Sequence, residues 1–251
     1  VMVTIKSKTE TELMKTAGRV TYETLKLLEE HTKPGVTTYE LDKLAERYIR
    51  SQGCTPSFKN YGGFPASVCT SVNSEIIHGF PSKHPLKEGD IVSFDVGAWY
   101  QGYNGDAART VGVGSISSEA QRLIDVTREC FFEGIKFARD GYRISDISGA
   151  IQKHAEKNGY SVLREYCGHG VGHDLHEDPE IPNYVTPGHR GIRIRPGMCL
   201  AIEPMVNQGS KEIYVADNGW TVMTVDGKLA AHYENSVLIT NGEPYLLTLC
   251  E

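Results

Sequence analysis

Residues 88–95 have the sequence EGDIVSFD, and residues 195–203 have the sequence RPGMCLAIE. In each segment a glycine precedes a run of mainly apolar residues that ends on an acid. When the two glycines are aligned, Asp95 coincides with Glu203, 108 positions later. The apolar and polar residues of the first segment alternate, which is typical of a half-buried strand. We therefore predict two related strands, each carrying an acid on the face away from the core.

Helical patterns repeat ahead of both strands. Apolar residues at three- and four-residue spacing predict a helix over about residues 10–32, and Thr37 with Glu40 predicts a capped helix that Gly53 ends. In the second half, Ser117 or Ser118 begins a helix that stops at Asp140-Gly141, and Ser145 caps a helix that ends at Asn158-Gly159.

Two helices followed by an antiparallel strand pair, used twice, predict an α+β fold with a pseudo-two-fold antiparallel sheet and helices on the outside. We expect residues 1–251 to form a single domain of two pseudo-symmetric halves, at about residues 9–115 and 116–251.

Four acids occupy matching places in the two halves. Asp95 and Glu203 lie in the outgoing strands, and Asp106 and Glu234 lie in the returning strands. A single such acid could face solvent, with Asp106 paired to Arg109. Four of them related by a two-fold axis would converge in the interior, where carboxylates cannot all stay ionised alone. Two divalent cations would neutralise four such charges.

A histidine-rich segment, YCGHGVGHDLHEDP at residues 166–179, holds His169, His173 and His176 among glycines. The glycines favour a strand or loop, which excludes the helical HExxH zinc motif. Carboxylates with one imidazole suit Mn, Fe or Co better than a thiolate-rich zinc site does. A metal pair bridged by carboxylates is a hydrolytic device.

Composition excludes several other classes. The net charge of −6 gives no basic surplus for nucleic acid, and no apolar run approaches the ~18 residues that cross a membrane. The first residues lack the apolar core of a signal peptide, so we expect a cytoplasmic protein. No cysteines form a CxxC pair, and we expect most of them to be buried thiols: Cys54, Cys69, Cys130, Cys167, Cys199 and Cys250.

The ordered set Asp95, Asp106, His169, Glu203 and Glu234 resembles the metal ligands of methionine aminopeptidases of the pita-bread (creatinase/aminopeptidase) fold. The segments at residues 72–79 and 166–184 resemble signatures of the type I enzymes in their compact, bacterial-style form. The similarity covers about residues 9–239.

This resemblance implies two divalent ions, Mn, Fe or Co, with Zn as a further candidate. Asp95 would chelate one ion, Asp106 and Glu234 would bridge both, and His169 and Glu203 would bind the second. It also implies a hydroxide activated by the metal pair, with Glu203 as the proton shuttle to the leaving amine.

Further roles follow from the same resemblance. His176 would stabilise the scissile carbonyl oxygen, and His78 would contact the peptide nitrogen near the leaving group. The methionine pocket would be lined by Phe58, Tyr61, Phe64, Cys69 and Trp220, with Leu175 nearby, although each of these residues could also be ordinary core.

Several histidines leave their roles open. His173 could exchange with His169 as a ligand, and His232 could support the ligands from behind. We expect the remaining histidines to lie on the surface: His31, His84, His154 and His189.

The resemblance implies a catalytic domain that removes the initiator methionine from nascent proteins and peptides whose second residue is small. We expect a monomer, no DNA or membrane partner, and the ribosome as a candidate partner. The alternatives are an Xaa-Pro aminopeptidase or prolidase-like enzyme, a creatinase-like enzyme without metal, and a catalytically silent binding module of the same fold.

Overall fold

Two capped helices open the chain in the computed structural model, which describes residues 2–249. Helix α1 (Lys8–His31) begins after Ser7, and α2 (Thr38–Ser51) begins after Thr37. In both, the cap hydroxyl accepts a hydrogen bond from the third helical N–H, and the glutamate at that position accepts from the N–H of the cap. Two otherwise unpaired donors are thereby satisfied at the start of each helix. The sequence predicts this cap for Thr37 and Glu40 but not for Ser7 and Glu10.

In the second pair of helices, the end of the first helix and the start of the second differ from the prediction. Helix α3 (Ser118–Ile135) begins after Ser117 as predicted but ends before Asp140, because the chain continues in tighter turns. Helix α4 (Ile144–Lys157) begins after Arg143, so the prediction of Ser145 as the cap is wrong. Arg143 is extended and bridges to Arg193, and its N–H donates to Asp146 Oδ2 at 2.8 Å.

A nine-stranded antiparallel sheet forms the centre of the molecule. Seven of its strands run in the order β1 (Thr55–Pro56), β4 (Ile91–Tyr100), β5 (Tyr103–Gly112), β14 (Glu234–Leu238), β9 (Cys199–Ile202), β7 (Cys167–Gly170) and β8 (Glu177–Pro182). The other two strands pair beside this path: β2 (Val68–Val72) pairs with β4, and β15 (Tyr245–Leu246) pairs with β14.

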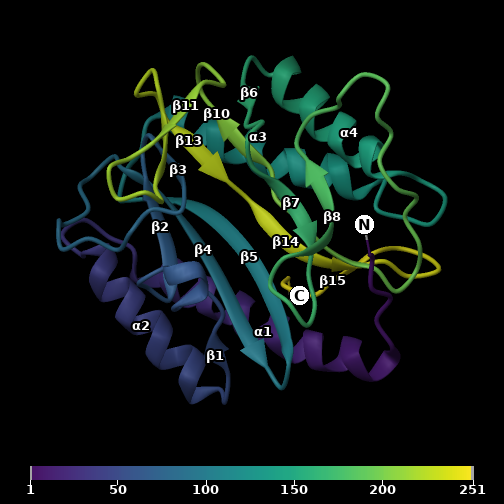
Figure 1. Cartoon of the computed structure of the whole chain (residues 1–251). Helices are drawn as coiled ribbons and strands as arrows, with labels where there is room; N and C mark the ends of the chain where they lie inside the picture. Colours follow the sequence, from purple (N-terminus) through teal and green to yellow (C-terminus); the bar gives the residue numbers. More distant parts are fainter. Residues whose placement is uncertain (1, 250–251) are drawn as a thin grey trace.

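Two three-stranded sheets and a short 3-10 helix (Tyr61–Gly63) complete the fold. The first sheet contains β13 (Ala230–His232), β10 (Met205–Asn207) and β6 (Ser161–Val162), and the second contains β11 (Ile213–Val215), β12 (Val222–Thr224) and β3 (Glu75–Ile77). Helices α1 and α2 lie beside the strands of the first half, and α3 and α4 beside those of the second (Figure 1). The predicted α+β class is confirmed. No helix within residues 2–249 is long and apolar enough to cross a membrane.

Strand β14 joins the two halves of the sheet. It pairs with β9 of its own half and with β5 of the first half, where Glu234 is opposite Ala108 (Figure 1). The Asp106 N–H donates to Ser236 Oγ at 3.0 Å, and this hydroxyl donates back to the Asp106 carbonyl at 2.8 Å. The returning strand predicted around Glu234 is divided at Tyr233, because β13 pairs with β10 in a different sheet.

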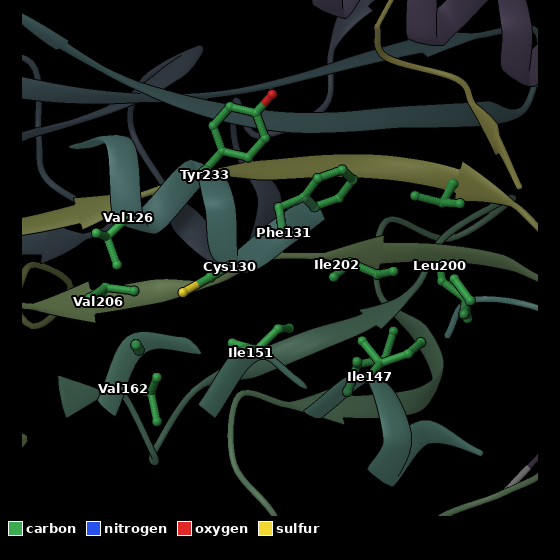
Figure 2. Close-up of a cluster of buried hydrophobic side chains, with 14 of the residues drawn as sticks. Val126, Cys130, Phe131, Ile147, Ile151, Val162, Leu200, Ile202, Val206 and Tyr233 are labelled. Atoms are coloured by element: carbon green, nitrogen blue, oxygen red, sulfur yellow. The ribbon is translucent and has the colours of Figure 1, made fainter. Parts of the chain in front are cut away.

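The largest core lies between α3, α4 and the sheet. Figure 2 shows Phe131 of α3 and Ile151 of α4 among side chains from β9 and β10, and Phe131 lies 5.5 Å from the Tyr233 ring between centroids. The free cysteines among the described residues are buried or, for Cys167, half-buried, as predicted, while Cys250 lies outside the described residues.

Helix α1 crosses β5 at a close approach that depends on two glycines. A Cβ on Gly105 would lie 2.7 Å from the backbone nitrogen of Gly18, and one on Gly18 would lie 2.2 Å from the Leu247 carbonyl oxygen. Backbone atoms cannot rotate away as a flexible side chain can, so a methyl group here would push the helix off the sheet.

We expect Gly105→Ala to lower the free energy of unfolding by about 1–3 kcal/mol, the usual cost of overpacking. Urea denaturation measures this change. Gly149→Ala in α4 is the matched control, because its added Cβ would meet only a methyl of Val185, at 3.3 Å. Equal midpoints for the two variants would show that the helix contact tolerates a side chain.

Candidate metal centre and substrate pocket

The four acids that the sequence singles out converge on one cavity. Asp95 and Asp106 lie on the paired strands β4 and β5, Glu203 directly follows β9, and Glu234 begins β14. All four side chains line the same cavity. The pairing of β14 with both β5 and β9 brings the acids of the two halves together.

His169 on β7 faces these acids. Its Nε2 lies 3.7 Å from Asp106 Oδ2 and 3.6 Å from Glu203 Oε1, and its Nδ1 lies 2.8 Å from the Gly170 carbonyl oxygen. That contact assigns the proton to Nδ1 and leaves the Nε2 lone pair directed at the carboxylates. Burial lowers the pKa of His169 to about 3, which keeps the ring neutral.

The carboxylates are strongly perturbed by their surroundings. Burial raises the pKa of Asp95 to about 7 and the pKa of Glu203 well above its ordinary value. Burial raises the pKa values of Asp106 and Glu234 in the same direction, and the neighbouring negative charges add to the effect. A protein interior tolerates such a cluster only with protons or cations among the acids.

Arg109 does not neutralise the cluster. It donates to the Glu234 main-chain carbonyl and, at 2.6 Å, to Asn235 Oδ1, and its guanidinium lies 4.2 Å from the centre of the Tyr233 ring. The alternative that Asp106 pairs with Arg109 is therefore wrong. Within residues 2–249, the basic groups at 3.4–3.8 Å from Asp106, Glu203 and Glu234 are the imidazoles of His169 and His232. Burial lowers the pKa of both rings, to about 3 and about 4, so they bring no positive charge to the acids.

The donor set fits divalent cations. Among the described residues, Asp95 Oδ1, Asp106 Oδ1 and Glu234 Oε1 are buried and have no hydrogen-bond partner. Ligand atoms of Asp106, His169 and Glu234 lie within 4.8 Å of one another, as do those of Glu203, His232 and Glu234. Glu234 belongs to both groups, which is the arrangement that a bridging carboxylate requires, and Asp95 adds a further carboxylate to the same cavity.

The cavity that the acids line has a volume of about 170 Å³ and is lined by apolar side chains as well. This volume is below the ~300–1,000 Å³ of sites for drug-sized ligands and suits one side chain. The structure brings every predicted pocket residue to its lining: Phe58, Tyr61, Phe64, Cys69, Leu175 and Trp220. Phe80 packs edge-on against Phe64 at 5.4 Å between centroids. The sequence analysis missed Phe80, because its apolar character alone does not distinguish it from core.

Two histidines border this pocket. Tyr61 Oη lies 2.8 Å from His176 Nδ1, and the His176 ring centre lies 4.3 Å from that of His169. His78 follows β3 with φ of +58°, a backbone conformation that non-glycine residues rarely adopt. Its ring lies 5.5 Å from Tyr166, and burial lowers its pKa to about 4. His78 and His176 both line the cavity that holds the acids.

A buried ion pair supports the turn that carries His176. The next residue, Glu177, pairs with Lys6, and their side chains are 9% and 4% exposed. Thr4 Oγ also donates to Glu177, at 2.5 Å. The sequence analysis missed this contact because Lys6 and Glu177 lie 171 positions apart and no local pattern relates them.

The other histidines lie outside the cluster. The His173 side chain is 76% exposed, so the structure does not bring it to the carboxylates as a replacement for His169. His31, His84 and His189 are exposed as predicted. The surface prediction for His154 is wrong: the side chain is 22% exposed, and its Nε2 lies 2.8 Å from Glu129 Oε2.

Comparison with known proteins shows the family of the chain. The sequence model of metallopeptidase family M24 matches residues 12–241. The chain belongs to metallopeptidase family M24. Among its M24 relatives, the methionine aminopeptidase of Clostridium acetobutylicum is 56% identical over 251 residues, which covers 100% of both chains.

Solved M24 structures agree with the fold. The crystal structure of methionine aminopeptidase from Rickettsia prowazekii matches with a TM-score of 0.96 and 40% identity, over 99% of this chain and 100% of that one. A prolidase from Pyrococcus furiosus matches with a TM-score of 0.80 and 24% identity, over 98% of this chain and 66% of that one, which shows the fold alone. The predicted resemblance, the pita-bread fold and the metallo-exopeptidase class are confirmed.

Proposed function

We propose that this chain removes the N-terminal methionine from peptides and nascent proteins whose second residue is small. One observation carries the proposal: a cluster of buried acids and His169 lines the same small cavity as a group of apolar side chains. The high identity to methionine aminopeptidases supports methionine as the side chain that enters the pocket.

We assign the acids and His169 to two divalent ions. Asp95 would hold one ion, His169 and Glu203 the other, and Asp106 and Glu234 both. When bound, such ions supply charge neutralisation and a hydroxide nucleophile at neutral pH. The unpartnered oxygens of Asp95, Asp106 and Glu234 support this assignment, since an ion would satisfy all three.

Glu203 is suited to move a proton. Burial raises the pKa of its carboxyl group well above the ordinary value, which makes the carboxylate a stronger base. Its main-chain carbonyl accepts a hydrogen bond from Asn183 Nδ2 at 3.0 Å, which fixes the start of the side chain. Glu203 would take the proton of the attacking water and give it to the leaving amine.

His176 and His78 would act as neutral hydrogen-bond donors. We assign the Tyr61 hydroxyl as the donor to His176 Nδ1, so that Nε2 carries the proton and donates to the scissile carbonyl oxygen as charge develops there. His78 would contact the peptide nitrogen, and its lowered pKa keeps it uncharged in that role.

The lining of the cavity suits an apolar side chain next to a free amine. Phe58, Phe64 and Cys69 are buried, pack together with Leu175 and line the cavity beside the acids. The nearby carboxylates suit the positive charge of a free α-amine.

The remaining features of the proposal depend on this activity. We place the enzyme in the cytoplasm, where nascent chains emerge, as a monomer with the ribosome as a candidate partner. Residues 1–251 would act as one catalytic domain, because β14 belongs to the second half and pairs with β5 of the first.

The first test is methionine release from a Met-Ala-Ser peptide. Chelator-stripped protein is expected to be inactive, and adding Mn, Fe or Co is expected to restore release of the first residue alone. A Met-Pro-Ser peptide is the comparison substrate. Faster cleavage of the proline peptide would favour the prolidase-like alternative, and binding without turnover under any metal would favour the silent binding module.

A further inference from the structure

His232 is a third imidazole at the acid cluster. Its Nε2 lies 3.4 Å from Glu203 Oε2 and 3.8 Å from Glu234 Oε2. The side chain is fully buried, and neither ring nitrogen has a hydrogen-bond partner among the described residues. A buried polar group without a hydrogen bond lowers the stability of the fold by about 1–3 kcal/mol, so we expect the ring nitrogens of His232 to bind a partner.

The backbone of His232 is held in place. Its N–H donates to Thr110 Oγ1 at 2.9 Å, and the Thr110 hydroxyl lies at the same distance from the His232 carbonyl oxygen. His232 also pairs with Met205 across β13 and β10. The imidazole therefore projects toward the acids from a fixed point.

The Nε2 atoms of His232 and His169 lie at similar distances from carboxylate oxygens of the cluster. His169 Nε2 lies 3.7 and 3.6 Å from the carboxylate oxygens of Asp106 and Glu203, against 3.4 and 3.8 Å for His232. Two ligand atoms that bind one ion at ~2.1 Å, at angles of ~90–109°, lie about 3.0–3.4 Å apart. Each imidazole thus needs only a small adjustment to share an ion with its carboxylates.

We propose that His232 is an additional metal ligand, binding through Nε2 to an ion that Glu203 and Glu234 also hold. This inference rests on the metal centre of the proposed function and deepens it. The centre then contains two imidazoles instead of the single one implied by the five-residue set.

A second imidazole has a consequence for metal preference. Nitrogen ligands strengthen binding of Co and Zn more than binding of Mn, which favours oxygen. We expect His232→Gln to raise the Kd for Co²⁺ by about 10-fold or more and the Kd for Mn²⁺ by a smaller factor. Calorimetric titration of chelator-stripped protein measures both values.

Affinity alone does not separate a ligand from a residue that only positions Glu203, so the ligands themselves must be counted. In Co²⁺-loaded protein, each coordinated imidazole gives a strongly shifted, exchangeable N–H signal in the proton NMR spectrum. We expect two such signals from the wild-type protein, one from His232→Gln and two from the control His154→Gln, whose histidine lies on α4 away from the cluster.

One shifted signal from the wild-type protein would overturn the proposal, whether or not the variant folds. Two signals that both persist in a folded His232→Gln protein would overturn it as well. The number of shifted signals does not depend on turnover. Two signals without methionine release would contradict the proposed function but keep His232 as a ligand. Methionine release with only one signal would support the proposed function and contradict the ligand role of His232.

Discussion

Asp106→Asn is expected to abolish methionine release without loss of the fold. Asp106 is 3% exposed, one of its oxygens has no hydrogen-bond partner among the described residues, and the other faces His169. Asparagine has the same shape but replaces an anionic oxygen with an NH₂ group, so the proposed bridge between two ions is lost. We expect kcat/KM on Met-Ala-Ser to fall at least ~10³-fold, about 4 kcal/mol of transition-state stabilisation.

Metal content and stability complete this test. Bound metal should fall below that of the wild-type protein, while the metal-free variant should melt no earlier, since one of four mutually repelling carboxyl groups is gone. Asp125→Asn on α3 is the control, because Asp125 only accepts a hydrogen bond from Gln121 on the surface. Full turnover by Asp106→Asn would rule out the two-ion proposal.

His176→Ala is expected to lower kcat by ~10²–10³-fold with metal content unchanged, because the proposed role is to donate a hydrogen bond as the carbonyl oxygen gains charge. Tyr61→Phe should have a smaller effect in the same direction, since it removes only the hydroxyl at His176 Nδ1. His173→Ala is the matched control, a neighbouring histidine whose side chain is exposed. If bound metal falls with kcat, His176 is a ligand and its assignment here is wrong.

Local patterns predicted the elements that local interactions determine. The caps at Thr37 and Ser117 have signals within a few residues, and both form as predicted. The strand predicted to carry Asp95 forms as β4, which continues past this acid to Tyr100. The Arg143 cap was missed because a distant bridge to Arg193 sets the chain direction there. The break at Tyr233 was missed because its two sides pair with different sheets.

The features of the site also divide into those that the sequence predicted and those that only the structure shows. The internal repeat predicted four converging acids, since matching positions about a two-fold axis must meet. The methionine pocket and the roles of His78 and His176 came from the family resemblance, and the structure adds their placement around one cavity. Neither source indicated the pair between Lys6 and Glu177, because it depends on a contact between segments far apart in the chain. The sequence suggested that His232 supports the ligands, but not that its Nε2 lies 3.4 Å from Glu203 Oε2.

The position of β14 sets the order in which this protein can become active during synthesis. It is a central strand of the large sheet, yet it is made after every other strand of that sheet except β15. Until residue 238 has left the ribosome, β5 and β9 present unpaired edges, the kind of surface on which chains aggregate. Glu234, which belongs to both ligand groups, arrives with the same strand. Closure of the sheet and completion of the metal site are thus one event, and a chain cut short before β14 would have neither.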